Sequence, residues 1–123
     1  MRGPLFQAMT NLERRRYHRV PLKERCWCEG ACTTIYAIIK DVCEGGLFIR
    51  TSAPLKQGAR TRIRWSLLPG HEEIQADAVV VWSRSDAKSL SDPPGMGLRI
   101  EGISSEARER IRDYVRMALS SSD

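Results

Sequence analysis

The sequence of 123 residues lacks any long apolar run. The longest, Ala78–Trp82, is far too short to cross a bilayer, which takes about 20 apolar residues. The first residues also lack an apolar segment of signal-peptide length. These absences argue against a membrane-spanning or secreted protein, and we expect a cytoplasmic one.

Signatures of catalysis and of metal binding are also missing. No nucleophile stands at a recognisable spacing from a base and no paired-carboxylate motif is present, so the sequence does not indicate an enzyme. Cys26, Cys28 and Cys32 follow C-x-C and C-x(3)-C spacings, not the two C-x(2–4)-C pairs typical of structural zinc. We therefore expect no metal and no cofactor. In a strand, Cys26 and Cys28 would share one face as small buried thiols.

Outside the first 25 residues the sequence has no excess charge of either sign. Lysine and arginine number 20 against 15 aspartates and glutamates, for a net charge of +5. Seven basic and two acidic side chains in residues 1–25 account for all of it. A basic segment on a neutral body indicates a local anion site. A nucleic-acid binder that also uses Arg60, Arg62 and Arg64 is a weaker alternative, because these three fit the solvent face of a strand.

Apolar and polar residues alternate with a period of two over most of the chain, as in strands with one buried face. In residues 59–67, for example, Ile63 and Trp65 are expected inside and Arg62 and Arg64 outside. Turns rich in glycine and proline separate the strands, and no crossover helix intervenes. This order predicts an antiparallel sheet closed into a barrel or sandwich. The six expected strands lie at 23–28, 33–40, 46–51, 59–67, 74–83 and 96–101.

The last part of the chain changes to a helical period. Ser104 is a good N-cap for an amphipathic helix of about 15 residues. Its apolar stripe is expected to pack on the barrel and consists of Ile103, Ala107, Ile111, Val115 and Ala118, widened by Tyr114 and Leu119.

Two segments carry the residue types of a nucleotide site. Arg14-Arg15-x-x-x-Arg19 lies in the basic segment, and Asp41-x-Cys43-x-x-Gly46 follows later. Guanidinium groups clamp phosphates bidentately, and arginine is the commonest reader of the guanine O6/N7 edge. A carboxylate complements the other edge of guanine, because it accepts from the ring N–H and the exocyclic amine.

The two segments resemble the paired RxxxR and (D/N)xSxxG motifs of PilZ domains. Val79–Trp82 and Gly95–Ile100 are also similar to family segments, and the likeness runs from Glu13 to Leu119. It implies a mainly β fold, a six-stranded antiparallel PilZ-type β-barrel with a C-terminal amphipathic α-helix. It further implies a bacterial receptor for the second messenger cyclic di-GMP. The chain would then consist of an N-terminal arm (1–12), a PilZ domain (13–119) and a disordered tail (120–123).

Carried over by position, Arg15 and Arg19 would clamp phosphates and guanine edges, with Arg14 reinforcing them. Asp41 would hydrogen-bond a guanine. Binding is expected to draw the basic N-terminal arm onto the barrel, a disorder-to-order change that signals to a protein partner in trans.

The remaining motif positions are Cys43 and Gly46. Gly46 would permit the turn, and the Cys43 side chain would contact the ligand. The family usually has serine at position 43, and a thiol is the weaker donor. Losing one neutral hydrogen bond lowers affinity by on the order of 1 kcal/mol. The cysteine keeps one alternative open, a degenerate PilZ domain that binds no nucleotide and acts as a protein-interaction module.

Overall fold

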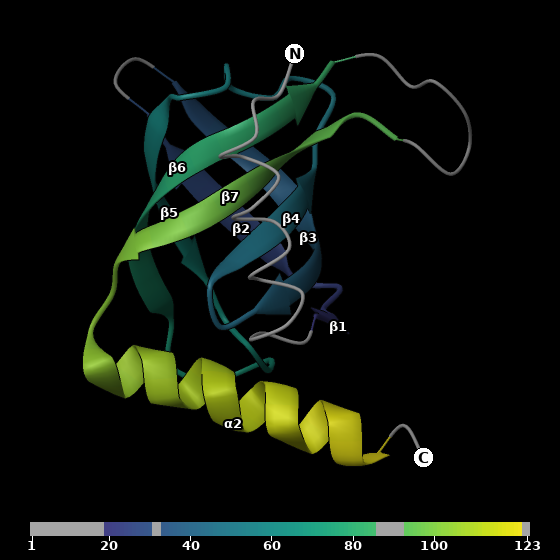
Figure 1. The fold of residues 1–123 in the computed structure, drawn as a ribbon, viewed down its shortest axis with the longest axis vertical. Coiled ribbons are helices and arrows are strands. Elements are labelled where there is room, and N and C mark those ends of the chain that lie inside the picture. Colours follow the sequence, from purple (N-terminus) through teal and green to yellow (C-terminus); the bar gives the residue numbers. More distant parts are fainter. Residues whose placement is uncertain (1–18, 31–32, 86–92, 122–123) are drawn as a thin grey trace, which may run out of the picture.

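The structure is a computed structural model that describes residues 19–30, 33–85 and 93–121 (Figure 1). Arg14, Arg15, Cys32 and the N-terminal arm lie outside the described residues, so the expectations about them stay predictions. Among the described residues, no helix has the length and apolar character that a membrane span requires.

Six strands close into an antiparallel barrel, as predicted. β3 pairs with β2 on one side and with β4 on the other, which closes the order β3-β2-β5-β6-β7-β4 into a ring. The six are β2 (Arg25–Glu29), β3 (Thr34–Cys43), β4 (Gly46–Arg50), β5 (Arg60–Trp65), β6 (Ile74–Arg84) and β7 (Gly95–Gly102).

A seventh, two-residue strand was not predicted. β1 (Val20–Pro21) pairs antiparallel with the end of β3, with Val20 opposite Val42 and Pro21 opposite Asp41. The Leu22 N–H extends the contact by donating to the Lys40 carbonyl at 3.0 Å. Two residues show no period, so only the register with β3 reveals this strand. It fixes the end of the basic segment on the barrel.

The barrel interior follows the predicted alternation. On β5, Thr61, Ile63 and Trp65 are buried, while Arg60 and Arg62 are exposed. Thr61 is polar, and its hydroxyl donates to the Glu29 carbonyl at 3.1 Å, so its burial leaves no unpaired donor. Cys26 and Cys28 are thiols with no exposed surface, which confirms that they share the inner face of a strand. The pKa of Cys26 is strongly raised by its hydrogen bond with Cys28 and by burial, which keeps it protonated.

The helix α2 (Ser105–Ser121) lies across one end of the barrel (Figure 1). Ser104 caps it as predicted, because its Oγ accepts from the Ala107 N–H at 3.1 Å. Ala107 and Ile111 belong to the core cluster, and Ile103, Tyr114, Val115 and Ala118 pack against it. Leu119, expected to widen the stripe, is 38% exposed. The helix continues through Ser121, two residues beyond its predicted end.

Candidate functional site

β1 brings Arg19 to Asp41. The Arg19 Nη1 donates a hydrogen bond to Asp41 Oδ1 at 2.9 Å, although the two residues are 22 positions apart in sequence. The side chains are 40% and 24% exposed, so a solute can reach both. The structure thus joins one predicted residue from each motif.

A β-bulge turns Asp41 outward. β3 was predicted to end at residue 40, but it continues to Cys43 because it pairs with β1 and β4 along its last residues. Its register with β4 shifts between Ile39 and Asp41. Ile39 and Val42 both face the core, so Lys40 and Asp41 lie together outside it. Bulges commonly re-aim side chains next to functional sites, and this one exposes the predicted guanine-binding carboxylate.

Cys43 follows Val42 and therefore points to the same side of β3 as Asp41. It is nevertheless fully buried, and it does not belong to the core cluster. A ligand could contact the thiol, as predicted, only after neighbouring groups move. Sequence alone did not indicate this burial.

Gly46 has a role different from the predicted one. Glu44 and Gly45 form the turn, and Gly46 is the first residue of β4, without a positive φ. A Cβ at Gly46 would overlap the carbonyl oxygen of Leu98. The glycine is required because the β7 backbone passes close to this position, and not because the turn demands its conformational freedom.

An aromatic row, which we define as Phe48 and Trp82, continues the site beyond Asp41. Asp41 is opposite Phe48, Phe48 is opposite Gly97, and Gly97 is opposite Trp82 in the ladders of four neighbouring strands. The two rings meet across Gly97 with centroids 5.0 Å apart. A side chain at Gly97 would overlap the indole. Sequence reasoning assigned neither aromatic residue to the site, since only strand register aligns them.

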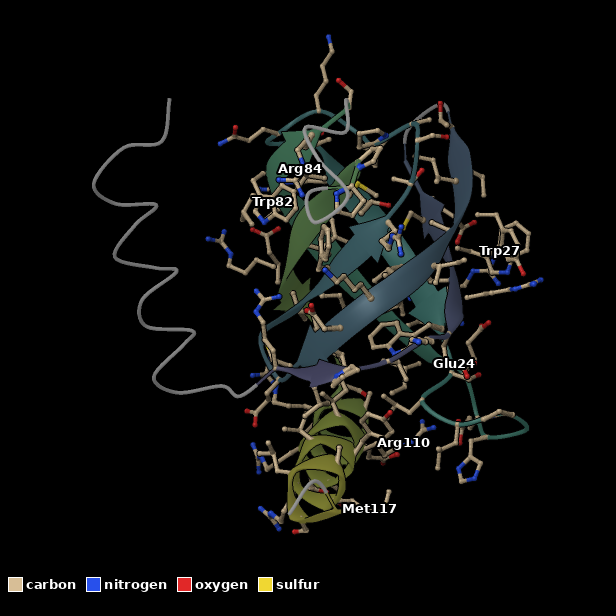
Figure 2. All side chains as sticks on the ribbon, turned by 90° about the vertical axis from the view of Figure 1, so that its right-hand side faces the viewer. Glu24, Trp27, Trp82, Arg84, Arg110 and Met117 are labelled. Carbon is tan, nitrogen blue, oxygen red and sulfur yellow. The ribbon has the colours of Figure 1, made fainter. Side chains whose placement is uncertain are left out.

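Two cations flank the aromatic row. Lys40 Nζ lies 5.3 Å from the Phe48 ring centroid, and the Arg84 guanidinium lies 5.1 Å from that of Trp82. Arg84 Nε also donates to the Pro93 carbonyl at 2.9 Å, which helps to fix its direction. Figure 2 shows Trp82 and Arg84 projecting together from one side of the barrel. Phe48 is only 7% exposed, so the partly exposed Trp82 provides most of the ring surface that a solute can reach, with the Arg84 charge beside it.

The turn of the second motif is tied to α2. Arg112 donates from Nε to Glu44 Oε1 at 3.0 Å and from Nη2 to Oε2 at 3.3 Å. These bonds lower the pKa of Glu44 below its ordinary value of 4.5. Tyr114 Oη donates to the Pro21 carbonyl at 3.4 Å. The helix thus contacts both β1 and the β3–β4 turn.

Within residues 19–30, 33–85 and 93–121, no group of histidine, cysteine and carboxylate side chains could hold a metal ion. The chemistry available at the site is instead that of arginine, carboxylate and aromatic rings, which bind anions and nucleobases.

Comparison with known proteins relates the chain to one family. Residues 13–117 match the family described as PilZ domain. No curated protein matches the chain.

Several solved structures share the fold. The inhibitor of motility MotI/DgrA of Bacillus subtilis aligns with a TM-score of 0.78 and 17% identity, over 89% of this chain and 53% of that chain. The PilZ domain of YcgR from Escherichia coli, solved with c-di-GMP, gives 0.68 and 18%, over 89% and 94%. PlzA of Borreliella burgdorferi in complex with c-di-GMP gives 0.56 and 18%, over 90% and 45%. The chain spans about half of the first and third proteins, and these identities show the fold alone.

Proposed function

Because the chain belongs to the PilZ domain family, whose members are non-enzymatic receptors of cyclic di-GMP, we propose that it is itself a cyclic di-GMP receptor and adaptor. That membership agrees with the missing catalytic motifs. The observation that carries the proposal is the Arg19–Asp41 pair, which unites the two motifs on an exposed part of the barrel.

The ligand supplies groups that match those of the site. Arg15 and Arg19 bind its phosphates and the O6/N7 edge of guanine, and Arg14 adds charge. Asp41 accepts from the N–H edge of guanine. Trp82 follows Asp41 and Phe48 along the ladders and is partly exposed, so its ring gives a guanine a surface to pack against.

Ligand binding exchanges one set of charge partners for another. Without ligand, Arg19 and Asp41 neutralise each other. Partly exposed ion pairs contribute roughly 0 to 1 kcal/mol, so opening this one costs little. Phosphate and guanine then satisfy the two side chains separately, and neither charge is left without a partner.

In this proposal, the N-terminal arm transmits ligand binding to a protein partner. Two phosphates draw the arginines of the basic segment together and fold the arm onto the barrel, where a protein partner in the cytoplasm reads it. Hydrogen exchange of residues 10–20 tests this step separately from binding. Unchanged exchange at saturating cyclic di-GMP would contradict the ordering step even if the ligand binds.

Calorimetric titration of the purified chain with cyclic di-GMP tests the proposal. We expect saturable binding, weakened about ten- to a hundredfold in Arg15→Ala and Arg19→Ala, because each loses charge-assisted bonds. Arg60→Ala is the matched control, since Arg60 is exposed on β5, away from the site. GTP and a short oligonucleotide should not compete with cyclic di-GMP for binding.

A second candidate function is favoured by one observation, the buried Cys43 in the usual serine position. In that case the chain is a degenerate PilZ domain that interacts with proteins and binds no nucleotide. Absence of heat at high cyclic di-GMP concentration, with the chain folded, would favour this alternative over the receptor.

A further inference from the structure

An apolar patch lies on the outer face of β2 and β3, and we define it as Trp27, Tyr36 and Ile38. These side chains are 40%, 48% and 50% exposed. Trp27 and Tyr36 are opposite each other in the ladder, with ring centroids 4.3 Å apart, and Ile38 follows Tyr36 on the same face. In Figure 2, Trp27 projects from the side of the barrel opposite Trp82. Adjacent large apolar side chains left exposed commonly mark an interaction site.

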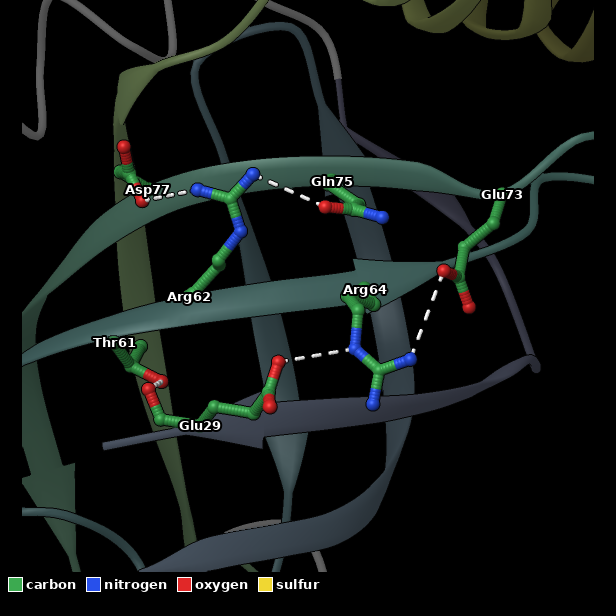
Figure 3. A network of polar contacts seen from close by, with 7 residues as sticks. All are labelled: Glu29, Thr61, Arg62, Arg64, Glu73, Gln75 and Asp77. Atoms are coloured by element: carbon green, nitrogen blue, oxygen red, sulfur yellow. Dashed lines mark hydrogen bonds and ion pairs between the residues drawn. The ribbon is translucent and has the colours of Figure 1, made fainter. Parts of the chain in front are cut away.

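The neighbouring outer face of β5 and β6 is different, because its charges are paired (Figure 3). Arg62 donates to Asp77 Oδ1 at 3.1 Å and to Gln75 Oε1 at 3.0 Å. Arg64 donates to Glu29 Oε1 at 3.0 Å and lies 3.7 Å from Glu73 Oε1. This barrel can therefore cover an outer face with polar groups that satisfy one another. The apolar patch is a local departure from that arrangement.

Three cations border the apolar patch. Arg25 and Arg50 flank Ile38 in the ladders of β2, β3 and β4, and Lys40 is the next outward residue of β3. In the part of the chain that the structure describes, none of the three forms an ion pair with a carboxylate. Glu24 precedes Arg25, but its charge acts on Tyr114 of α2. The pKa of Tyr114 is raised chiefly by burial and to a smaller extent by the charge of Glu24. The rim around Ile38 is thus positive, and no carboxylate among the described residues neutralises it.

We propose that the apolar patch docks a segment of a partner protein that combines aromatic or aliphatic side chains with Asp or Glu. The apolar side chains cover Trp27, Tyr36 and Ile38, and the carboxylates pair with the three bordering cations. Arg25 already has a fixed direction, because its Nη1 donates to Tyr36 Oη at 2.9 Å. The inference rests on the proposed adaptor role in requiring a partner, but it does not require cyclic di-GMP binding.

The observations favour protein over single-stranded nucleic acid at this patch. Base binding on a barrel needs open ring faces. Tyr36 is already engaged by Trp27 and by Arg25, whose guanidinium lies 5.6 Å from its ring centroid. Ile38 offers no ring on which a base could stack.

Selection from a phage-displayed library of random dodecapeptides on the immobilised full chain tests the inference. We expect enriched peptides that combine acidic with aromatic or aliphatic residues, and whose binding weakens as salt rises. A Tyr36→Ser/Ile38→Ser variant should lose roughly tenfold or more in affinity for them, as hot-spot truncation does. Arg50→Glu should lose a similar amount, and Arg60→Glu, on the outer face of β5, should lose none. Thermal melts verify that each variant is folded.

The inference is overturned if no peptide is enriched, if the enriched peptides are basic, or if they bind the patch variants as well as the wild type. Binding of oligo(dT) that is lost in Tyr36→Ser/Ile38→Ser would assign the patch to nucleic acid instead. The same peptides are measured on Arg19→Ala and on the wild type with and without cyclic di-GMP. Peptide binding without any cyclic di-GMP binding would refute the receptor function alone, and the reverse result would refute the docking patch alone.

Discussion

The guanidinium of Arg19 and the carboxylate of Asp41 meet at 2.9 Å across the outer surface of the barrel. Two structural features produce this contact. β1 holds the chain after Arg19 against the end of β3, and the bulge between Ile39 and Asp41 turns the carboxylate outward. The pair is thus a consequence of strand register. Its guanidinium can bind an anion, and its carboxylate can accept hydrogen bonds from the N–H edge of a base.

We expect Asp41→Asn to separate ligand affinity from stability. The substitution removes the charged acceptor for guanine, which lowers cyclic di-GMP affinity by about 1.5 to 3 kcal/mol. The free energy of unfolding should fall by only about 1 kcal/mol or less, because the ion pair is partly exposed. Calorimetry and urea unfolding measure the two quantities.

Asp77→Asn is the matched control for this substitution. Asp77 also pairs with an arginine, Arg62, at 3.1 Å, but on the outer face of β5 and β6. It should leave cyclic di-GMP affinity unchanged. Equal affinities for Asp41→Asn and the wild type would exclude Asp41 from the site.

Cys43→Ser should raise cyclic di-GMP affinity several-fold. A hydroxyl is a stronger donor than a thiol, and one neutral hydrogen bond contributes about 1 kcal/mol. Because position 43 is fully buried, the same substitution should lower stability slightly without ligand. Melting curves with and without ligand show both effects. If the variant binds no better than the wild type, the thiol does not limit affinity.

The sequence was sufficient to predict most of the fold, because its two signals, alternation and capping, are local. Ile63 and Trp65 face inward and Ser104 caps α2 as these signals require. The features that build the site depend on pairing between distant strands instead. Neither the two-residue β1 nor the bulge before Asp41 leaves a periodic signal in the sequence. The aromatic row could not be predicted for the same reason, because Phe48 and Trp82 are aligned only by strand pairing through Gly97.

Gly46→Ala should destabilise the barrel, whether or not ligand is present. The added Cβ would overlap the Leu98 carbonyl, and backbone cannot move aside as a flexible side chain does. Overpacking of this kind costs roughly 1 to 3 kcal/mol, and we expect the upper end. Gly30→Ala is the control, since its Cβ would meet Thr33 and Leu55 only at 3.5 to 4.0 Å. Equal thermal midpoints for the two variants would show that β7 yields at this position.

The Glu44–Arg112 contact should contribute to stability in a pH-dependent way. The folded-state pKa of Glu44 lies below the ordinary 4.5, chiefly because of the hydrogen bonds from Arg112. The stabilisation is therefore present above pH 4.5 and is lost as pH falls through the lower, folded-state pKa.

Glu44→Gln should lower the thermal midpoint near neutral pH, and the difference from the wild type should shrink in acid. Glu72→Gln, an exposed glutamate without an ion pair in the described part of the chain, should show no such trend. A difference independent of pH would mean that Glu44 acts through packing and not through its charge.

Trp82 provides a test of whether the aromatic row belongs to the ligand site or only packs the barrel. If guanine packs on the row, Trp82→Ala should lower cyclic di-GMP affinity by about 1 to 3 kcal/mol, the usual contribution of a base stacked on an aromatic ring. Gly97→Ala keeps the indole but displaces it, because the new methyl group would occupy its place over β7.

The chain has three tryptophans, so indole N–H resonances can be followed one by one. Saturating cyclic di-GMP should shift the Trp82 resonance and leave that of the core residue Trp65 unchanged. Wild-type affinity in both variants, with an unshifted Trp82 resonance, would restrict the site to the arginines and Asp41.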